Sequence, residues 1–65
     1  MMKIIARRMK GDAFGYTIEM YEDGELAVKE FSSYKPVLSN GSIIFETKTE
    51  IMSLSAPIIR IQKED

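Results

Sequence analysis

The sequence predicts an all-β fold, a small antiparallel barrel or curled sheet of five to six strands that forms a single domain over residues 1–65. Two turn signals support this fold class: Glu22-Asp23-Gly24 and Asn40-Gly41 each lie between stretches of alternating apolar and polar residues. The stretches around these turns are rich in the β-branched and aromatic residues that favour strands.

The first strand is predicted over residues 2–10, where Met2, Ile4 and Ala6 alternate onto one face. A helix competes here, because Ala, Arg, Met and Lys are good helix formers. The β-branched pair Ile4-Ile5 and the early stop at Gly11-Asp12 favour the strand.

The central hairpin is predicted over residues 15–31, with a three-residue loop at 22–24. This register pairs Met20 with Leu26 and Ile18 with Val28. A two-residue loop would instead pair Ile18 with the charged Lys29, and a shift of one residue turns a whole apolar set to the other face. The three-residue loop is therefore expected.

A second hairpin is predicted at Asn40-Gly41, because both residues accept the positive φ of a two-residue turn. Pairing around this turn places Leu38 opposite Ile43 and Val37 opposite Ile44. Pro36 has no amide donor, so the strand before the turn is expected to pair only loosely at its start.

Residues 47–57 fit two structures. Thr47 and Glu50 have the spacing of a capping box, which would begin a short helical turn near 48–55 and end it before Pro57. An irregular or strand-like path is preferred over the helix, and as a strand it would have Met52, Leu54 and Ala56 on one face. A last strand follows at residues 58–63.

The number of strands resembles the general plan of SH3-like and OB-like barrels, a resemblance of strand count alone. The expected core draws on every predicted strand. It comprises Ile4 or Ile5, Ile18, Met20, Leu26, Val28, Phe31, Ile44 or Phe45, Leu54, Ile59 and Ile61.

Composition argues against an enzyme, a cofactor or a metal site. The chain has no cysteine and no histidine, which removes thiolate chemistry and the usual transition-metal ligands. Its serines have no histidine to activate them, and a neighbouring pair such as Ser33 and Lys35 occurs often in surface loops. A barrel of 65 residues also leaves little room for a substrate cleft.

The hydropathy pattern predicts a cytoplasmic protein. No apolar run is long enough to span a membrane, and no signal-peptide core follows Lys3. The net charge is −1, but it is unevenly distributed: the charged residues among 1–10 are all basic, whereas those among 19–30 are acidic except for Lys29.

The first functional hypothesis is a non-enzymatic protein-binding module. Tyr34 and Lys35 lie beside Pro36 on a predicted edge, and exposed edges and tyrosines are common features of interfaces. The acidic turn with Tyr21, Glu22, Asp23 and Glu25 presents negative charge to a basic partner. A small regulator or inhibitor of another protein, such as a phage or bacterial accessory protein, would have this character.

Two alternatives remain open. Arg7, Arg8, Lys10 and Phe14 combine basic and aromatic side chains, as small barrels that bind single-stranded nucleic acid do, although the low pI weighs against this function. The third hypothesis is a self-assembling structural subunit, a homo-oligomer in which strands 2–9 and 58–61 pair across a two-fold axis.

Overall fold

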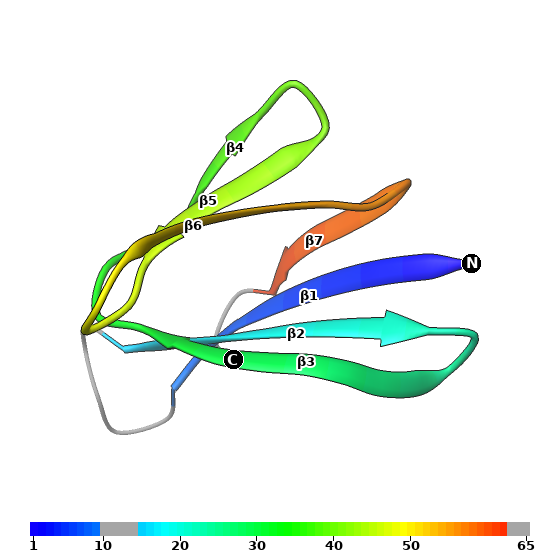
Figure 1. Cartoon of the computed structure of the whole chain (residues 1–65), viewed down its shortest axis with the longest axis horizontal. Helices are drawn as coiled ribbons and strands as arrows, with labels where there is room; N and C mark the ends of the chain where they lie inside the picture. The colour runs from blue at the N-terminus through cyan, green and yellow to red at the C-terminus, as the bar shows by residue number, and fades with distance from the viewer. Residues whose placement is uncertain (10–14, 63–65) are drawn as a thin grey trace.

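The computed structural model describes residues 1–9 and 15–62, and these residues form seven strands in two sheets (Figure 1). The four-stranded sheet has the order β3 (Glu25–Ser32), β2 (Tyr16–Glu22), β1 (Met2–Arg8), β7 (Ile58–Gln62). The three-stranded sheet has the order β4 (Val37–Ser39), β5 (Ser42–Glu46), β6 (Ile51–Ser55). The all-β prediction is confirmed. Within the described ranges no helix has the length and hydropathy to traverse a bilayer.

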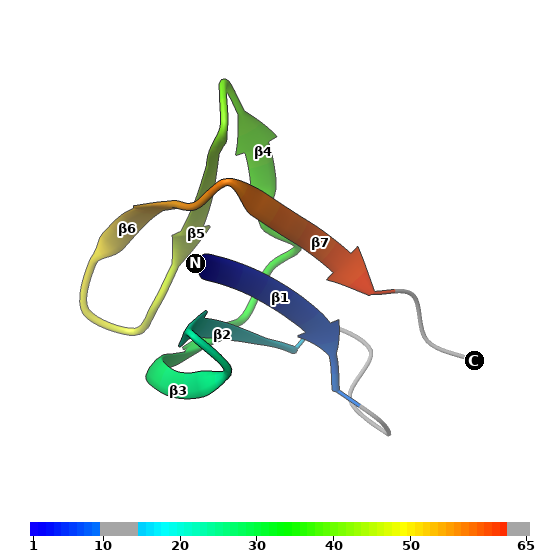
Figure 2. The ribbon, with the colours of Figure 1, turned by 90° about the vertical axis from the view of Figure 1, so that its right-hand side faces the viewer.

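The two sheets face each other as open layers and do not close into a barrel (Figure 2). The chain passes from the four-stranded sheet to the three-stranded sheet after β3, and it returns at Ala56-Pro57 between β6 and β7. Pro57 suits this crossing because it has no amide hydrogen to donate to either ladder. The barrel and the count of five or six strands were therefore wrong.

The fold is also not purely antiparallel, because β1 and β7 pair in parallel, with Ile4 beside Ile59 and Ala6 beside Ile61. Parallel neighbours need a long crossover, and here β2 to β6 supply it. β1 is thus paired on both sides within the chain and has no free edge for pairing across a two-fold axis.

Both hairpin turns are two-residue turns with positive φ at each central residue, Asp23-Gly24 and Asn40-Gly41. The second hairpin has the predicted register, with Val37 opposite Ile44. The three-residue loop predicted for the first hairpin was wrong. A β-bulge beside Met20 and Tyr21 takes up the extra residue in β3 instead.

The bulge changes which residues of β3 are buried. Tyr21 pairs with Leu26 on the outer face of the sheet, whereas Met20 pairs with Val28 on the inner face. The bulge turns Leu26 outward, where it is 51% exposed, and Phe31 is 50% exposed because it lies on the outer face opposite Thr17. The assignment of both residues to the core was wrong. Ser32 is the fully buried residue at the end of β3, and its hydroxyl donates to the carbonyl oxygen of Tyr34 at 2.7 Å.

The core lies between the two sheets. Its buried side chains are Ile4, Ala6 and Ile18 from the four-stranded sheet and Ile43 and Phe45 from the three-stranded sheet. Partly buried residues pack around them: Tyr16, Met20, Met52, Leu54, Ala56, Ile59 and Ile61. The predicted inward faces of β6 and β7 are therefore confirmed.

The helical turn near 48–55 was wrong, because residues 47–50 form the turn between β5 and β6. The Thr47 amide donates to the Glu50 carbonyl oxygen at 2.8 Å, and the Thr47 hydroxyl oxygen accepts from the Glu50 amide at 3.2 Å. The two residues of the expected capping box, Thr47 and Glu50, thus bond to each other across a tight turn. β6 starts directly afterwards at Ile51.

Candidate binding face on the four-stranded sheet

The outer face of the four-stranded sheet gathers most of the side chains that could bind a ligand. Alternation along each strand turns every second residue away from the core, and the pairing registers align these residues in rows across the sheet. We call this surface the cationic face. Its strand residues are Lys3, Ile5, Arg7, Thr17, Glu19, Tyr21, Leu26, Lys29, Phe31, Ile58, Arg60 and Gln62.

The charges on the cationic face are strongly unequal. Its described strand positions hold four basic side chains, those of Lys3, Arg7, Lys29 and Arg60, against the single carboxylate of Glu19. The sum of +4 and −1 is +3, although the whole chain has a net charge of −1. The fold therefore separates charges that are mixed along the sequence.

A hydrogen-bonded network fixes the middle of this face. One oxygen of Glu19, Oε1, accepts from Arg7 Nε at 3.0 Å and from the Tyr21 hydroxyl at 3.0 Å. Arg7 Nη1 also donates to Gln62 Oε1 at 2.6 Å. The hydrogen bond from Arg7 lowers the pKa of Glu19 below its ordinary value, and the bond to Glu19 raises the pKa of Arg7. The network thus keeps both groups charged across the physiological range.

Apolar and aromatic side chains lie between the charges. Phe31 and Leu26 are half-exposed at the β3 edge, Ile58 is exposed on β7, and Tyr21 is partly buried on β2. Aromatic rings on an open sheet provide flat surfaces for stacking, whereas the basic side chains around them attract anions.

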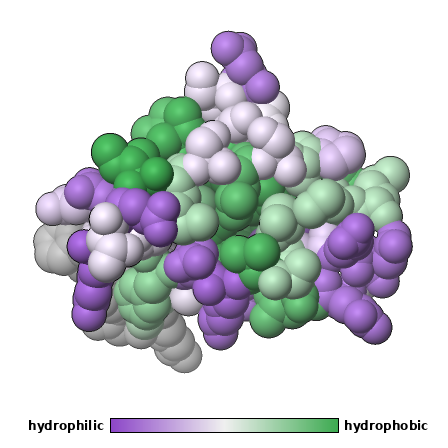
Figure 3. Space-filling view, viewed as in Figure 1, coloured by the Kyte–Doolittle hydropathy of each residue, from purple (hydrophilic) through white to green (hydrophobic). Residues whose placement is uncertain are grey.

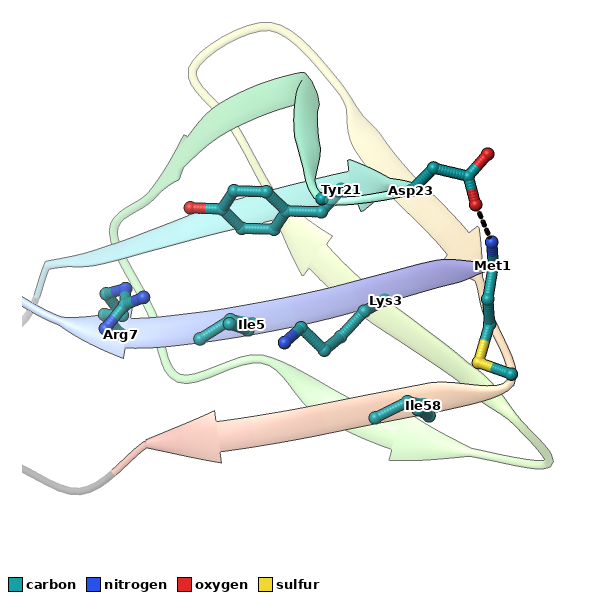
Figure 4. A pocket seen from close by; sticks show the side chains of 8 residues that line it. Met1, Lys3, Ile5, Arg7, Tyr21, Asp23 and Ile58 are labelled. Carbon is teal, nitrogen blue, oxygen red and sulfur yellow. Dashed lines mark hydrogen bonds and ion pairs between the residues drawn. The ribbon is translucent and has the colours of Figure 1, made fainter.

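The face is hollowed between β2 and β7. A recess of about 540 Å³ is lined by residues of the N-terminus, β1, the β2–β3 turn and β7, including Lys3, Ile5, Tyr21 and Ile58 (Figure 4). A second recess of about 530 Å³ adjoins it and is lined by Arg7 and Arg60, among others. Both recesses have basic side chains in their walls.

The residues predicted for nucleic-acid binding are not all brought together. Arg7 lies on the cationic face, but Arg8 follows it in β1 and takes the opposite side of the sheet, in the row of Tyr16. Lys10 and Phe14 lie outside the described residues.

The residues predicted for protein binding fall into two groups. Tyr21, Glu22, Asp23 and Glu25 lie at the hairpin end of β2 and β3, where the N-terminal ammonium of Met1 pairs with the Asp23 carboxylate. Tyr34 and Lys35 lie in the connection after β3, at the other end of that strand. Eight residues of β3 separate the groups by about 25 Å, so they do not form one patch.

Sequence reasoning missed Lys3 and Lys29 as members of a site. A signal for Lys3 was present, because alternation along β1 places Lys3, Ile5 and Arg7 on one face. Alternation along β3 likewise places Lys29 on one face with Phe31, and the bulge changes only its partner across the hairpin, which is Glu19.

A second exposed surface lies on the outside of the three-stranded sheet, and we call it the apolar face. Val37 is 59% exposed and Ile51 is 72% exposed, and Ile44 lies between them on the central strand. Hydrophobic residues are visible over this sheet in the space-filling view (Figure 3).

No protein-family model, no curated protein and no solved structure gives a significant match to this chain. Among the described residues, no group of three or more acidic side chains is placed to hold a metal ion. The two exposed faces are therefore the features from which we argue a function.

Proposed function

We propose that the protein is a non-enzymatic binding module whose cationic face binds single-stranded nucleic acid. The observation that carries this proposal is the composition of that face, where four basic side chains and one acidic one surround the half-exposed ring of Phe31 and the partly buried ring of Tyr21. Proteins that bind single strands combine these two elements, basic groups for phosphates and aromatic rings for bases.

The arrangement across the strands supports this function. The basic residues come from three strands: Lys29 from β3, Lys3 and Arg7 from β1, and Arg60 from β7. They therefore extend from one edge of the sheet to the other, across the direction of the strands. A flexible polyanion that crosses the sheet would contact all four charges along its backbone.

The negative net charge of the whole chain does not oppose this function. At physiological ionic strength, interactions between exposed charges are largely screened beyond a Debye length of about 8 Å. The acidic residues Glu22 and Glu25 lie at the hairpin end, and Glu46 and Glu50 lie on the three-stranded sheet and its turn. A nucleic-acid strand bound across the centre of the cationic face is therefore close mainly to positively charged side chains.

Fluorescence anisotropy with labelled single-stranded DNA and RNA at low salt tests the proposal. We expect binding that weakens when Lys29→Gln or Arg60→Gln removes one charge from the face. Lys35→Gln is the matched control, because it removes the same charge from the β3–β4 connection. Absence of binding by the native protein, or equal loss of binding in the control, would overturn the proposal.

A second candidate function is protein binding through the apolar face, as a regulator or inhibitor of another protein. The observation that favours it is the exposure of Val37, opposite Ile44, and of Ile51 on the same face of the sheet. Exposed apolar side chains that gather on one sheet are typical of surfaces that contact another protein.

Photo-crosslinking in cells distinguishes the partners. A benzophenone side chain replaces Ile51 on the apolar face, and in a matched variant it replaces Lys29 on the cationic face. A nuclease-resistant adduct of one defined mass at position 51 alone supports protein binding. An adduct with the mass of two copies supports self-assembly instead, and no adduct at position 51 counts against both.

A further inference from the structure

The recess beside Tyr21 is lined mainly by apolar, aromatic and basic side chains, and the Asp23 carboxylate that also lines it pairs with the N-terminal ammonium of Met1. Its volume of about 540 Å³ lies in the range of small-molecule sites. Ile5 and Ile58 provide apolar surface on β1 and β7, and the side chain of Lys3 lies over β1 near both of them (Figure 4). Arg7 lines the end of the recess towards which the Tyr21 hydroxyl points (Figure 4).

Tyr21 is held in a fixed orientation. Its ring lies along β2 with the hydroxyl towards Arg7 (Figure 4), and the hydroxyl donates to Glu19 Oε1 at 3.0 Å. The same oxygen accepts from Arg7 Nε, so one carboxylate positions both the ring and the guanidinium. Groups that are already ordered lose less conformational entropy when a ligand binds.

Arg7 retains the capacity to bind a phosphate while it takes part in this network. Its two described hydrogen bonds use one N–H on Nε and one on Nη1, to Glu19 and Gln62. A guanidinium has five N–H donors, more than these two hydrogen bonds use. Arg7 and Lys3 are both exposed and lie on the same face of β1, four residues apart, with Ile5 between them.

We propose that this recess is a nucleotide subsite, in which one base of a bound single strand stacks against Tyr21 over Ile5 and Ile58, and an adjacent phosphate binds Arg7 at the end of the recess. This inference rests on the proposed function of the cationic face. Glu19 is a positioning residue in this subsite, because it acts through the Tyr21 ring and the Arg7 guanidinium.

Base stacking distinguishes this subsite from a merely electrostatic surface. A polyanion without bases would contact the four basic residues equally well but would leave the recess unfilled. Stacking on an aromatic side chain is tolerant of sequence, because every base has a flat face. We therefore expect the subsite to depend strongly on the presence of a base and weakly on which base is present.

The experiment compares oligothymidylate with an abasic oligodeoxyribose phosphate of the same length, measured by anisotropy competition at fixed salt. We expect the native protein to prefer the base-containing strand by about 5- to 150-fold, the range that one stacked base contributes. Tyr21→Leu should lose this preference, whereas Tyr21→Phe should keep it. Tyr34→Leu is the matched control, because Tyr34 lies in the β3–β4 connection, outside the recess.

The outcomes separate the subsite from the proposed function. Equal affinity of the native protein for both strands would overturn the subsite and leave polyanion binding intact. No affinity for either strand would overturn both proposals. If circular dichroism shows that Tyr21→Leu fails to fold, Ile58→Asp at an exposed position of the recess should lose the preference instead. A preference that this variant retains would assign stacking to Phe31 and overturn the subsite.

Discussion

The salt dependence of oligonucleotide affinity provides a quantitative test of the cationic face. The perturbation is the double substitution Lys29→Gln and Arg60→Gln, which removes one basic side chain from each edge strand of the four-stranded sheet. Both side chains are exposed and lie outside the core, so the substitutions leave the packing between the sheets unchanged.

The expected magnitude follows from the number of charges on the face. For single strands, log K falls with log salt by about 0.7 for each phosphate that a basic residue neutralises. Four basic residues predict a slope of about −2.8, or about −2.1 if Glu19 continues to neutralise Arg7. Raising the salt from about 50 to 200 mM should then weaken native binding by about 20- to 50-fold, but binding of the double variant by only about 3- to 7-fold.

The assay is a series of anisotropy titrations with one labelled oligonucleotide at several salt concentrations. Lys35→Gln serves as the control for a general change of charge, and it should keep the native slope. The reasoning is refuted if the double variant retains the native slope, or if Lys35→Gln reduces the slope as much as one substitution on the face.

Three further predictions concern stability, each measured by urea denaturation. Ile18→Ala should lower the free energy of unfolding by about 2–5 kcal/mol, because Ile18 is fully buried, whereas Leu26→Ala at a half-exposed site should cost under about 1 kcal/mol; equal costs would contradict the bulged register. Gly41→Ala should cost about 1–2 kcal/mol, because φ is +78° at Gly41, and no cost would argue against this turn. The pKa of Glu19 in the folded state lies below its ordinary value of 4.5. Ionised Glu19 therefore stabilises the fold fully above pH 4.5, and this stabilisation is lost as the pH falls through the folded-state pKa. Glu19→Gln should abolish this loss of stability on acidification, and an unchanged dependence of the free energy of unfolding on pH would contradict the prediction.

Much of the local structure could be predicted from the sequence. The Asn40-Gly41 hairpin has the predicted register, because its turn residues and its flanking strands are neighbours in the chain. The inward faces of β6 and β7 follow from alternation over a few residues. The register of the first hairpin was harder to predict. Its turn type depends on Asp23 and Gly24 alone, but the bulge between the turn and the middle of the hairpin depends on packing against the core.

The candidate site was harder to predict, because it depends on pairing between segments that are distant in the sequence. Arg7 and Arg60 are separated by 52 intervening residues, and their rows meet only because β1 and β7 pair in parallel. Lys29 joins the same surface through the register of β2 and β3, which the bulge shifts. Linear charge counts therefore describe a basic N-terminus and an acidic centre, whereas the folded chain has one face with an excess of positive charge.

The amino-acid sequence alone was sufficient to predict that this protein is all-β and where most of its strands and turns lie. These properties depend on local periodicity, on turn residues and on the residue types present. Only the tertiary structure decided that the strands form two open sheets and that Lys3, Arg7, Lys29 and Arg60 share a face with Tyr21. Pairing between distant strands decides this, because the energy of each pairing depends on how the whole core packs and not on any single segment.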